Sequence, residues 1–86
     1  MEPPRRPFRV EILTPAGTVG RLDQIVSARL PGADGMVGVL AERAPLLAAL
    51  RGGPMLLEDI EGRQHEFFVD HGFAQVRENA LTVVAE

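Results

Sequence analysis

Two short clusters carry the residue types that acid–base catalysis and metal binding use. They are His65-Glu66 and Asp70-His71, which hold both histidines of the chain. If the run between them is extended, six residues at about 3.3 Å each separate the histidines by about 20 Å. Zinc ligands lie about 2 Å from the metal, so this spacing excludes a shared site unless the chain bends sharply. We therefore predict no metal site, and a metal-dependent enzyme using His65 and His71 stays a minor alternative.

The other polar residues give little support for catalysis. Ser27 is the only serine, and it lacks the small-residue elbow that exposes a nucleophilic hydroxyl. Glu58, Asp59 and Glu61 crowd one expected hairpin end, where charges usually solvate a turn. The chain has no cysteine and no lysine, which excludes thiol chemistry, Schiff bases, P-loops and lipoyl or biotinyl attachment. We predict a non-enzymatic protein with no catalytic residues and no cofactor.

Length and composition indicate one soluble domain. The 86 residues are 45% hydrophobic and 24% charged, the averages of globular proteins, and they suffice for one modest core. A formal net charge of −3 gives no basic surface for phosphate backbones, so nucleic acid is not an expected partner. No signal sequence is recognisable, and no apolar stretch approaches the roughly 20 residues of a membrane span. We expect a cytoplasmic protein with residues 1–7, rich in proline and arginine, disordered.

The elements that must position any functional residue read as strands. Apolar and polar residues alternate in 8–14, and a longer strand is expected over 19–30. Gln24 and Ile25 break the alternation there, which indicates either a bulge or an edge that faces a partner. A turn cluster at 31–35 should present Met36 in a tight loop ahead of a short strand over 36–40. Further strands are predicted over 55–60, 64–70, 72–78 and 80–85.

Residues 44–50 are ambiguous. Alanine and leucine favour a helix there, and Gly52 would suit its C-terminus, but a strand is equally compatible with the pattern. Short strands with turn signals every eight to twelve residues indicate an all-β sandwich or small barrel. The stretch 36–50 also holds more apolar material and fewer charges than a small domain needs to expose. It is either a plain core segment or an interface.

The run Gly35-Met36-Val37-Gly38-Val39-Leu40-Ala41-Glu42-Arg43-Ala44-Pro45-Leu46-Leu47 resembles the signature of the epsilon subunit of F-type ATP synthase. In that family a glycine-rich turn precedes a short strand and an Ala-Pro-Leu-Leu element. Further similarity runs through Val10 to Gly17, His65 to Phe73 and Leu81 to Glu86, so the resemblance covers about residues 8–86. It implies an all-β single domain, a flattened β-sandwich of about eight to ten short strands, in which 44–50 is extended.

The resemblance also implies a mechanical function. The family's β domain clamps the gamma subunit, through an exposed apolar sheet face, and rests on the membrane ring of c subunits, coupling ion flow to ATP synthesis. The partners would be gamma and the c-ring, with only indirect membrane association at the cytoplasmic face of the bacterial inner membrane. The c-ring contact implied for this chain lies in the turn and loop from residue 35 to residue 43, at Gly35, Met36, Val37, Gly38, Glu42 and Arg43.

Three departures from the family pattern bear on this expectation. The chain stops at Glu86, where the family usually continues into a regulatory two-helix domain. Glu42-Arg43 stands where Gly-His is common, and Met36 where an acidic residue is common, which alters the charge of the expected contact. Asp70-His71-Gly72 replaces a more usual Ser-Gly-Gly. The alternative is therefore a stand-alone regulatory or adaptor β module outside the motor.

Overall fold

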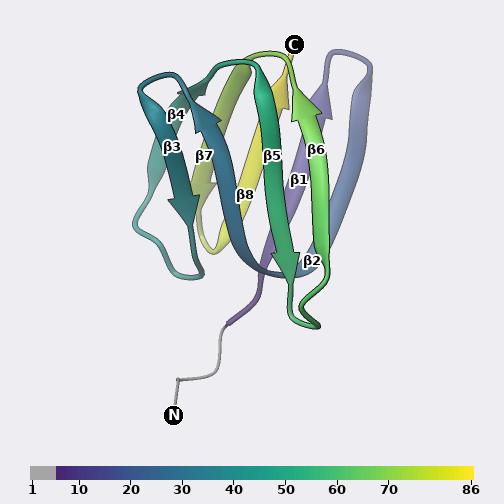
Figure 1. Cartoon of the computed structure of the whole chain (residues 1–86), viewed down its shortest axis with the longest axis vertical. Helices are drawn as coiled ribbons and strands as arrows, with labels where there is room; N and C mark the ends of the chain where they lie inside the picture. The colour runs from purple at the N-terminus through teal and green to yellow at the C-terminus, as the bar shows by residue number, and fades with distance from the viewer. Residues whose placement is uncertain (1–5) are drawn as a thin grey trace.

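The computed structural model describes residues 6–86, which form eight strands and no helix (Figure 1). In chain order the strands are β1 (Phe8–Thr14), β2 (Gly17–Gly32), β3 (Gly35–Val39), β4 (Leu46–Leu50), β5 (Gly53–Asp59), β6 (Gln64–Val69), β7 (Gly72–Arg77) and β8 (Ala80–Ala85). The predicted all-β fold is confirmed. Within these residues no helix exists that is long and apolar enough to cross a membrane.

The long strand β2 joins the two layers of a β-sandwich. Its first half pairs with β1, and its second half pairs with β3 and β5. One layer therefore contains β3, the second half of β2, β5 and β6, and the other contains the first half of β2, β1, β8, β7 and β4 (Figure 1). The β1–β8 ladder is parallel and the others are antiparallel.

The crossing of β2 between layers takes place at the predicted bulge. Gln24 has a left-handed backbone with φ of 64°, and the β1–β2 register shifts between the pairs Phe8–Ile25 and Val10–Leu22. A bulge adds one residue to one strand and increases its bend. Ile25 and Val26 are consequently both buried, which a regular strand would not allow for neighbours.

The core lies between the layers and is apolar. Its fully buried side chains come from both layers and include Val10, Ile25, Leu30, Met55 and Leu81. No polar or charged residue is buried among residues 6–86. Burial of each large aliphatic side chain contributes about 1.5–3 kcal/mol, so this core is a main source of the stability of the domain.

Two sequence-based boundaries differ from the structure. The helical alternative for residues 44–50 is wrong, and the extended alternative is confirmed, because Leu46–Leu50 pairs with β7 along its whole length. The expected turn cluster at 31–35 is also shorter than predicted, since β2 continues to Gly32 and only residues 33–34 form the turn. Pro31 is compatible with the strand because its carbonyl accepts the N–H of Arg51, and no N–H is required of it.

Candidate functional site along β3 and the following loop

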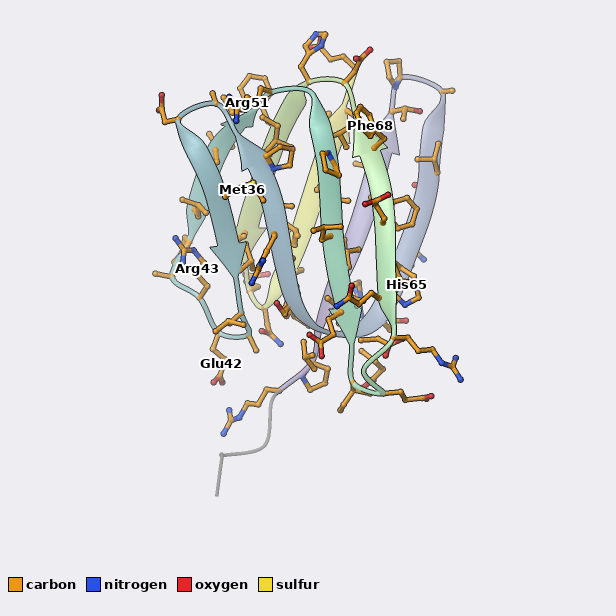
Figure 2. All side chains as sticks on the ribbon, viewed as in Figure 1. Met36, Glu42, Arg43, Arg51, His65 and Phe68 are labelled. Carbon is orange, nitrogen blue, oxygen red and sulfur yellow. The ribbon has the colours of Figure 1, made fainter. Side chains whose placement is uncertain are left out.

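The six expected contact residues lie on two consecutive elements. Gly35, Met36, Val37 and Gly38 belong to β3, and Glu42 and Arg43 belong to the loop 40–45. Met36, expected at the start of a short strand after a tight loop, lies in β3, where it pairs with Pro31 directly after the two-residue turn. Figure 2 shows Met36, Arg43 and Glu42 along one side of the sandwich, with Met36 toward one end and Glu42 at the other.

β3 is an edge strand with one free side. Within the described part of the chain it pairs only with β2, and it contains no charged residue and no proline. Val39 is buried, whereas Met36 on the outer face is 59% exposed. Edge strands usually carry charge, proline or a bulge that blocks pairing with another chain. The free side of β3 lacks these features and is available for contact.

The loop 40–45 is fixed by side chains from distant parts of the sequence. The backbone N–H of Glu42 donates to Oδ1 of Asn79 at 2.9 Å, and Glu42 itself has a left-handed φ of 60°. The carboxylate of Glu42 lies 2.7 Å from the guanidinium of Arg6. Asn79 in turn donates from Nδ2 to the carbonyl of Pro7. These contacts anchor the loop at Glu42, and half-buried Ala41 packs against the core, whereas the other side chains of the loop are exposed.

A shallow hollow of about 380 Å³ opens between the second half of β2 and the loop 40–45. Arg29 and Arg43 both line it, and the described residues around it include no carboxylate. Sequence reasoning included Arg43 in the contact but missed Arg29. The feature of the sequence that could have indicated Arg29 is Gly38, because this residue lies opposite Arg29 in the β2–β3 register and has no side chain to cover it. The other residues that line the hollow are Ser27, Ala28, Gly38, Val39, Leu40 and Ala41.

Both outer faces of the sandwich carry exposed apolar side chains. On the layer with β3, Met36 and Phe68 extend outward near the same end of the molecule, and Phe68 is 78% exposed (Figure 2). On the other layer the exposed apolar residues are Leu47, Phe73 and Val84. Phe73 and Val84 are directly paired between β7 and β8. Either layer thus has exposed apolar side chains on its outer face.

The two histidines make separate contacts. His65 donates from Nε2 to Oδ2 of Asp59 at 3.0 Å, and His71 lies 2.9 Å from Glu86. The hydrogen bond from His65 lowers the pKa of the Asp59 carboxyl, partial desolvation opposes this, and the backbone N–H groups of Arg63 and Glu61 add to the lowering. Residues 6–86 contain no group of three or more potential metal ligands. His65 and His71 are therefore not brought together.

Ser27, considered above as a nucleophile, is half-buried on β2 and lines the hollow beside Arg29. The described residues show no hydrogen bond between Ser27 and either histidine, and the Nε2 atoms of His65 and His71 contact carboxylates instead. The arrangement gives no general base for its hydroxyl. The surface of the described residues thus combines an open strand edge, a loop with side-chain anchors and outer faces with exposed apolar residues.

Comparison with known proteins gives this domain a family. Residues 7–86 match the model of the ATP synthase delta/epsilon chain, beta-sandwich domain, and the chain belongs to this family. The ATP synthase epsilon chain of Desulfosudis oleivorans is 40% identical over 80 residues, covering 92% of this chain and 59% of that relative. That of Nitratidesulfovibrio vulgaris strain DP4 is 38% identical over 79 residues, covering 92% and 58%. The chain therefore spans somewhat more than half the length of these relatives.

Solved structures agree on the fold. A chain of the Euglena gracilis mitochondrial ATP synthase superposes with a TM-score of 0.83 at 16% identity, covering 99% of this chain and 52% of that one. A chain from the central stalk and c-ring structure of the Tetrahymena thermophila enzyme gives 0.76 at 14% identity, covering 94% and 64%. The resemblance to the epsilon-type β-sandwich is thus confirmed.

Proposed function

We propose that this chain is the β domain of a central-stalk rotor subunit, which binds the gamma subunit and the c-ring of an F-type ATP synthase. The observation that carries the proposal is the family match over residues 7–86, together with relatives named ATP synthase epsilon chain. In this function the domain transmits torque and performs no chemistry. It would work at the cytoplasmic face of the bacterial inner membrane, with membrane contact only through the complex.

The side formed by β3 and the loop 40–45 is the proposed contact with the c-ring. Three features support this assignment: the open edge of β3, the exposed Met36, and the ordered loop that presents Glu42 and Arg43. The proposed contact comprises Gly35, Met36, Val37, Gly38, Glu42 and Arg43. A rigid loop suits this function because little conformational entropy is lost when it meets a partner.

The proposed gamma contact is one of the apolar outer faces. Exposed apolar patches on small domains mark interaction sites, and both layers carry one. The layer with β7 and β8 offers adjacent Phe73 and Val84, and the layer with β3 offers Met36 and Phe68. Substituting aspartate at Phe73 and, separately, at Phe68 and measuring binding to purified gamma subunit would identify the face.

Affinity purification of the tagged chain from the source cells tests the function. We expect the gamma subunit and the rest of the F1 core to be recovered with it, followed by c subunits when the membrane is solubilised under mild conditions. Recovery of the free chain without gamma, from cells whose ATP synthase is intact, would contradict a rotor function. That result would favour the alternative of a stand-alone regulatory or adaptor module.

A further inference from the structure

Arg29 and Arg43 differ from the arginines that have carboxylate partners. Among residues 6–86, four guanidinium groups lie within 3.4 Å of a carboxylate oxygen, those of Arg6, Arg9, Arg21 and Arg63. Arg29 and Arg43 have no such partner in this part of the chain, and both line the same hollow. Arginine is always protonated in proteins. Two guanidinium groups without a carboxylate ion-pair partner among the described residues therefore share one surface depression, and on its other side Arg29 lines a second hollow with Glu58.

The structure keeps this depression open. Gly38 lies opposite Arg29, and a Cβ atom built on Gly38 would meet nothing within 4 Å, so no side chain covers the space beside Arg29. Glu42, next to Arg43 in sequence, is held by Arg6 at 2.7 Å. The exposed side chain of Leu40 adds an apolar wall to the hollow. The positive charge is thus available to a molecule from outside.

We propose that Arg29 and Arg43 together bind a carboxylate side chain of the subunit that contacts β3 and the loop 40–45. The inference rests on the proposed function and specifies the chemistry of the partner. Guanidinium groups match a carboxylate through two parallel N–H···O bonds, and such charge-assisted bonds strengthen when an interface excludes water. The adjacent free edge of β3 offers backbone groups to a protein segment.

A protein carboxylate fits the surroundings better than an anionic membrane surface does. Binding to anionic lipid depends on clusters of several basic residues. This hollow has only two arginines, and the chain as a whole has a net charge of −3. The hollow is also bounded by apolar Leu40 and Val39, which suits a partner side chain with an apolar neighbour. Local charge complementarity of this kind fixes orientation in an interface.

The absence of lysine from the chain allows a direct test in the assembled complex. Arg43→Lys places the only lysine amine of the chain at the edge of the hollow, and a carbodiimide joins an amine to a carboxylate only when the two are in contact. We expect the Arg43→Lys complex to give a cross-link from residue 43 to an aspartate or glutamate of a neighbouring rotor subunit. Arg51→Lys is the matched control, since Arg51 lies outside the hollow at the other end of β3 (Figure 2).

The cross-link could fail simply because the lysine amine does not reach the carboxylate, so a second measurement tests binding directly. The double variant Arg29→Gln/Arg43→Gln should bind the purified rotor subunits at least about tenfold more weakly, and its affinity should depend much less on salt concentration. The control Arg51→Gln should bind as the unsubstituted chain does. Equal binding by the double variant would overturn the carboxylate site while leaving the rotor function intact. No binding by the unsubstituted chain would instead overturn the rotor function, and the site with it.

Anionic vesicles separate the remaining source of negative charge. Flotation with vesicles containing phosphatidylglycerol should recover none of the chain if the site takes a protein carboxylate. Recovery that disappears in the Arg29→Gln/Arg43→Gln variant, without any cross-link at residue 43, would show that the hollow takes lipid phosphate and would overturn the proposal.

Discussion

Asn79 accepts the backbone N–H of Glu42 across 37 residues of sequence, at 2.9 Å, and so fixes the loop 40–45 to the β7–β8 turn. The same side chain donates to the carbonyl of Pro7, and so also holds the segment that precedes β1. Asn79 has a left-handed φ of 58°, a conformation that asparagine adopts more readily than most residues. One turn residue therefore orders the loop that carries Arg43.

Asn79→Ala should lower the free energy of unfolding by about 1–2 kcal/mol. The substitution removes two exposed hydrogen bonds, together worth about 1 kcal/mol, and leaves an alanine at a left-handed position, at a cost of about 1 kcal/mol. Asn79→Gly removes the same bonds without the backbone cost, so it should be less destabilising. Urea denaturation checks this order of stabilities. Hydrogen exchange should show that the Glu42 amide is less protected in both variants than in the unsubstituted chain. Unchanged exchange at Glu42 would contradict the anchoring of the loop.

Gly72→Ala should be among the most destabilising single changes in this domain. A Cβ at Gly72 would lie within van der Waals overlap of the Val84 carbonyl oxygen, and backbone atoms of a paired strand cannot move aside cheaply. We expect a loss of about 3 kcal/mol or more, visible as a lower denaturation midpoint. Gly38→Ala is the control, because its Cβ meets nothing within 4 Å and the change should stay within about 0.5 kcal/mol. Similar midpoints for the two variants would contradict this packing.

The sequence allowed the strands to be predicted where local patterning determines them. Alternation identified β1. The broken alternation at Gln24 and Ile25 left a bulge and a partner-facing edge open, and the structure has the bulge. The turn at 31–35 was placed too broadly because proline and glycine are common in turns. Here Pro31 needs no N–H partner, and Gly32 is required because its Cβ would collide with the Gly35 carbonyl. Local composition does not reveal such tertiary requirements.

The candidate site was predictable only in part. Glu42 and Arg43 came from the family pattern, but the meeting of Arg29 with Arg43 depends on the β2–β3 register and on the loop conformation. That conformation is set by Asn79, far away in sequence. No periodicity links three such positions, so the hollow could be recognised only from the folded chain.

Asp59→Asn should change how stability depends on pH in acid. The bond from His65 and two backbone N–H groups hold the folded-state pKa of Asp59 below its ordinary value of 3.8. The carboxylate therefore stabilises the fold above that value, and the contribution disappears as pH falls below 3.8 through the folded-state pKa. Denaturation midpoints across this range should show Asp59→Asn less stable near neutrality, with the difference narrowing in acid. The control Glu66→Gln, an exposed carboxylate on β6, should give no such narrowing, and a constant difference for Asp59→Asn would contradict the linkage.

Met36→Asp should weaken rotor assembly without unfolding the domain. Met36 extends from the outer face of an edge strand and is 59% exposed, so a polar replacement leaves the core intact, and the free energy of unfolding should change by about 0.5 kcal/mol or less. Burying a new carboxylate in a subunit interface carries a desolvation cost, which should reduce recovery of the complex at a given subunit concentration. Ile60→Asp introduces the same group at an exposed apolar position in the β5–β6 turn, and it should assemble normally.

Arg43→Ala should also assemble poorly while its circular dichroism spectrum stays that of the folded chain. Loss of the folded spectrum in either contact variant would show a structural function instead, and normal assembly of a folded Met36→Asp chain would move the contact away from β3.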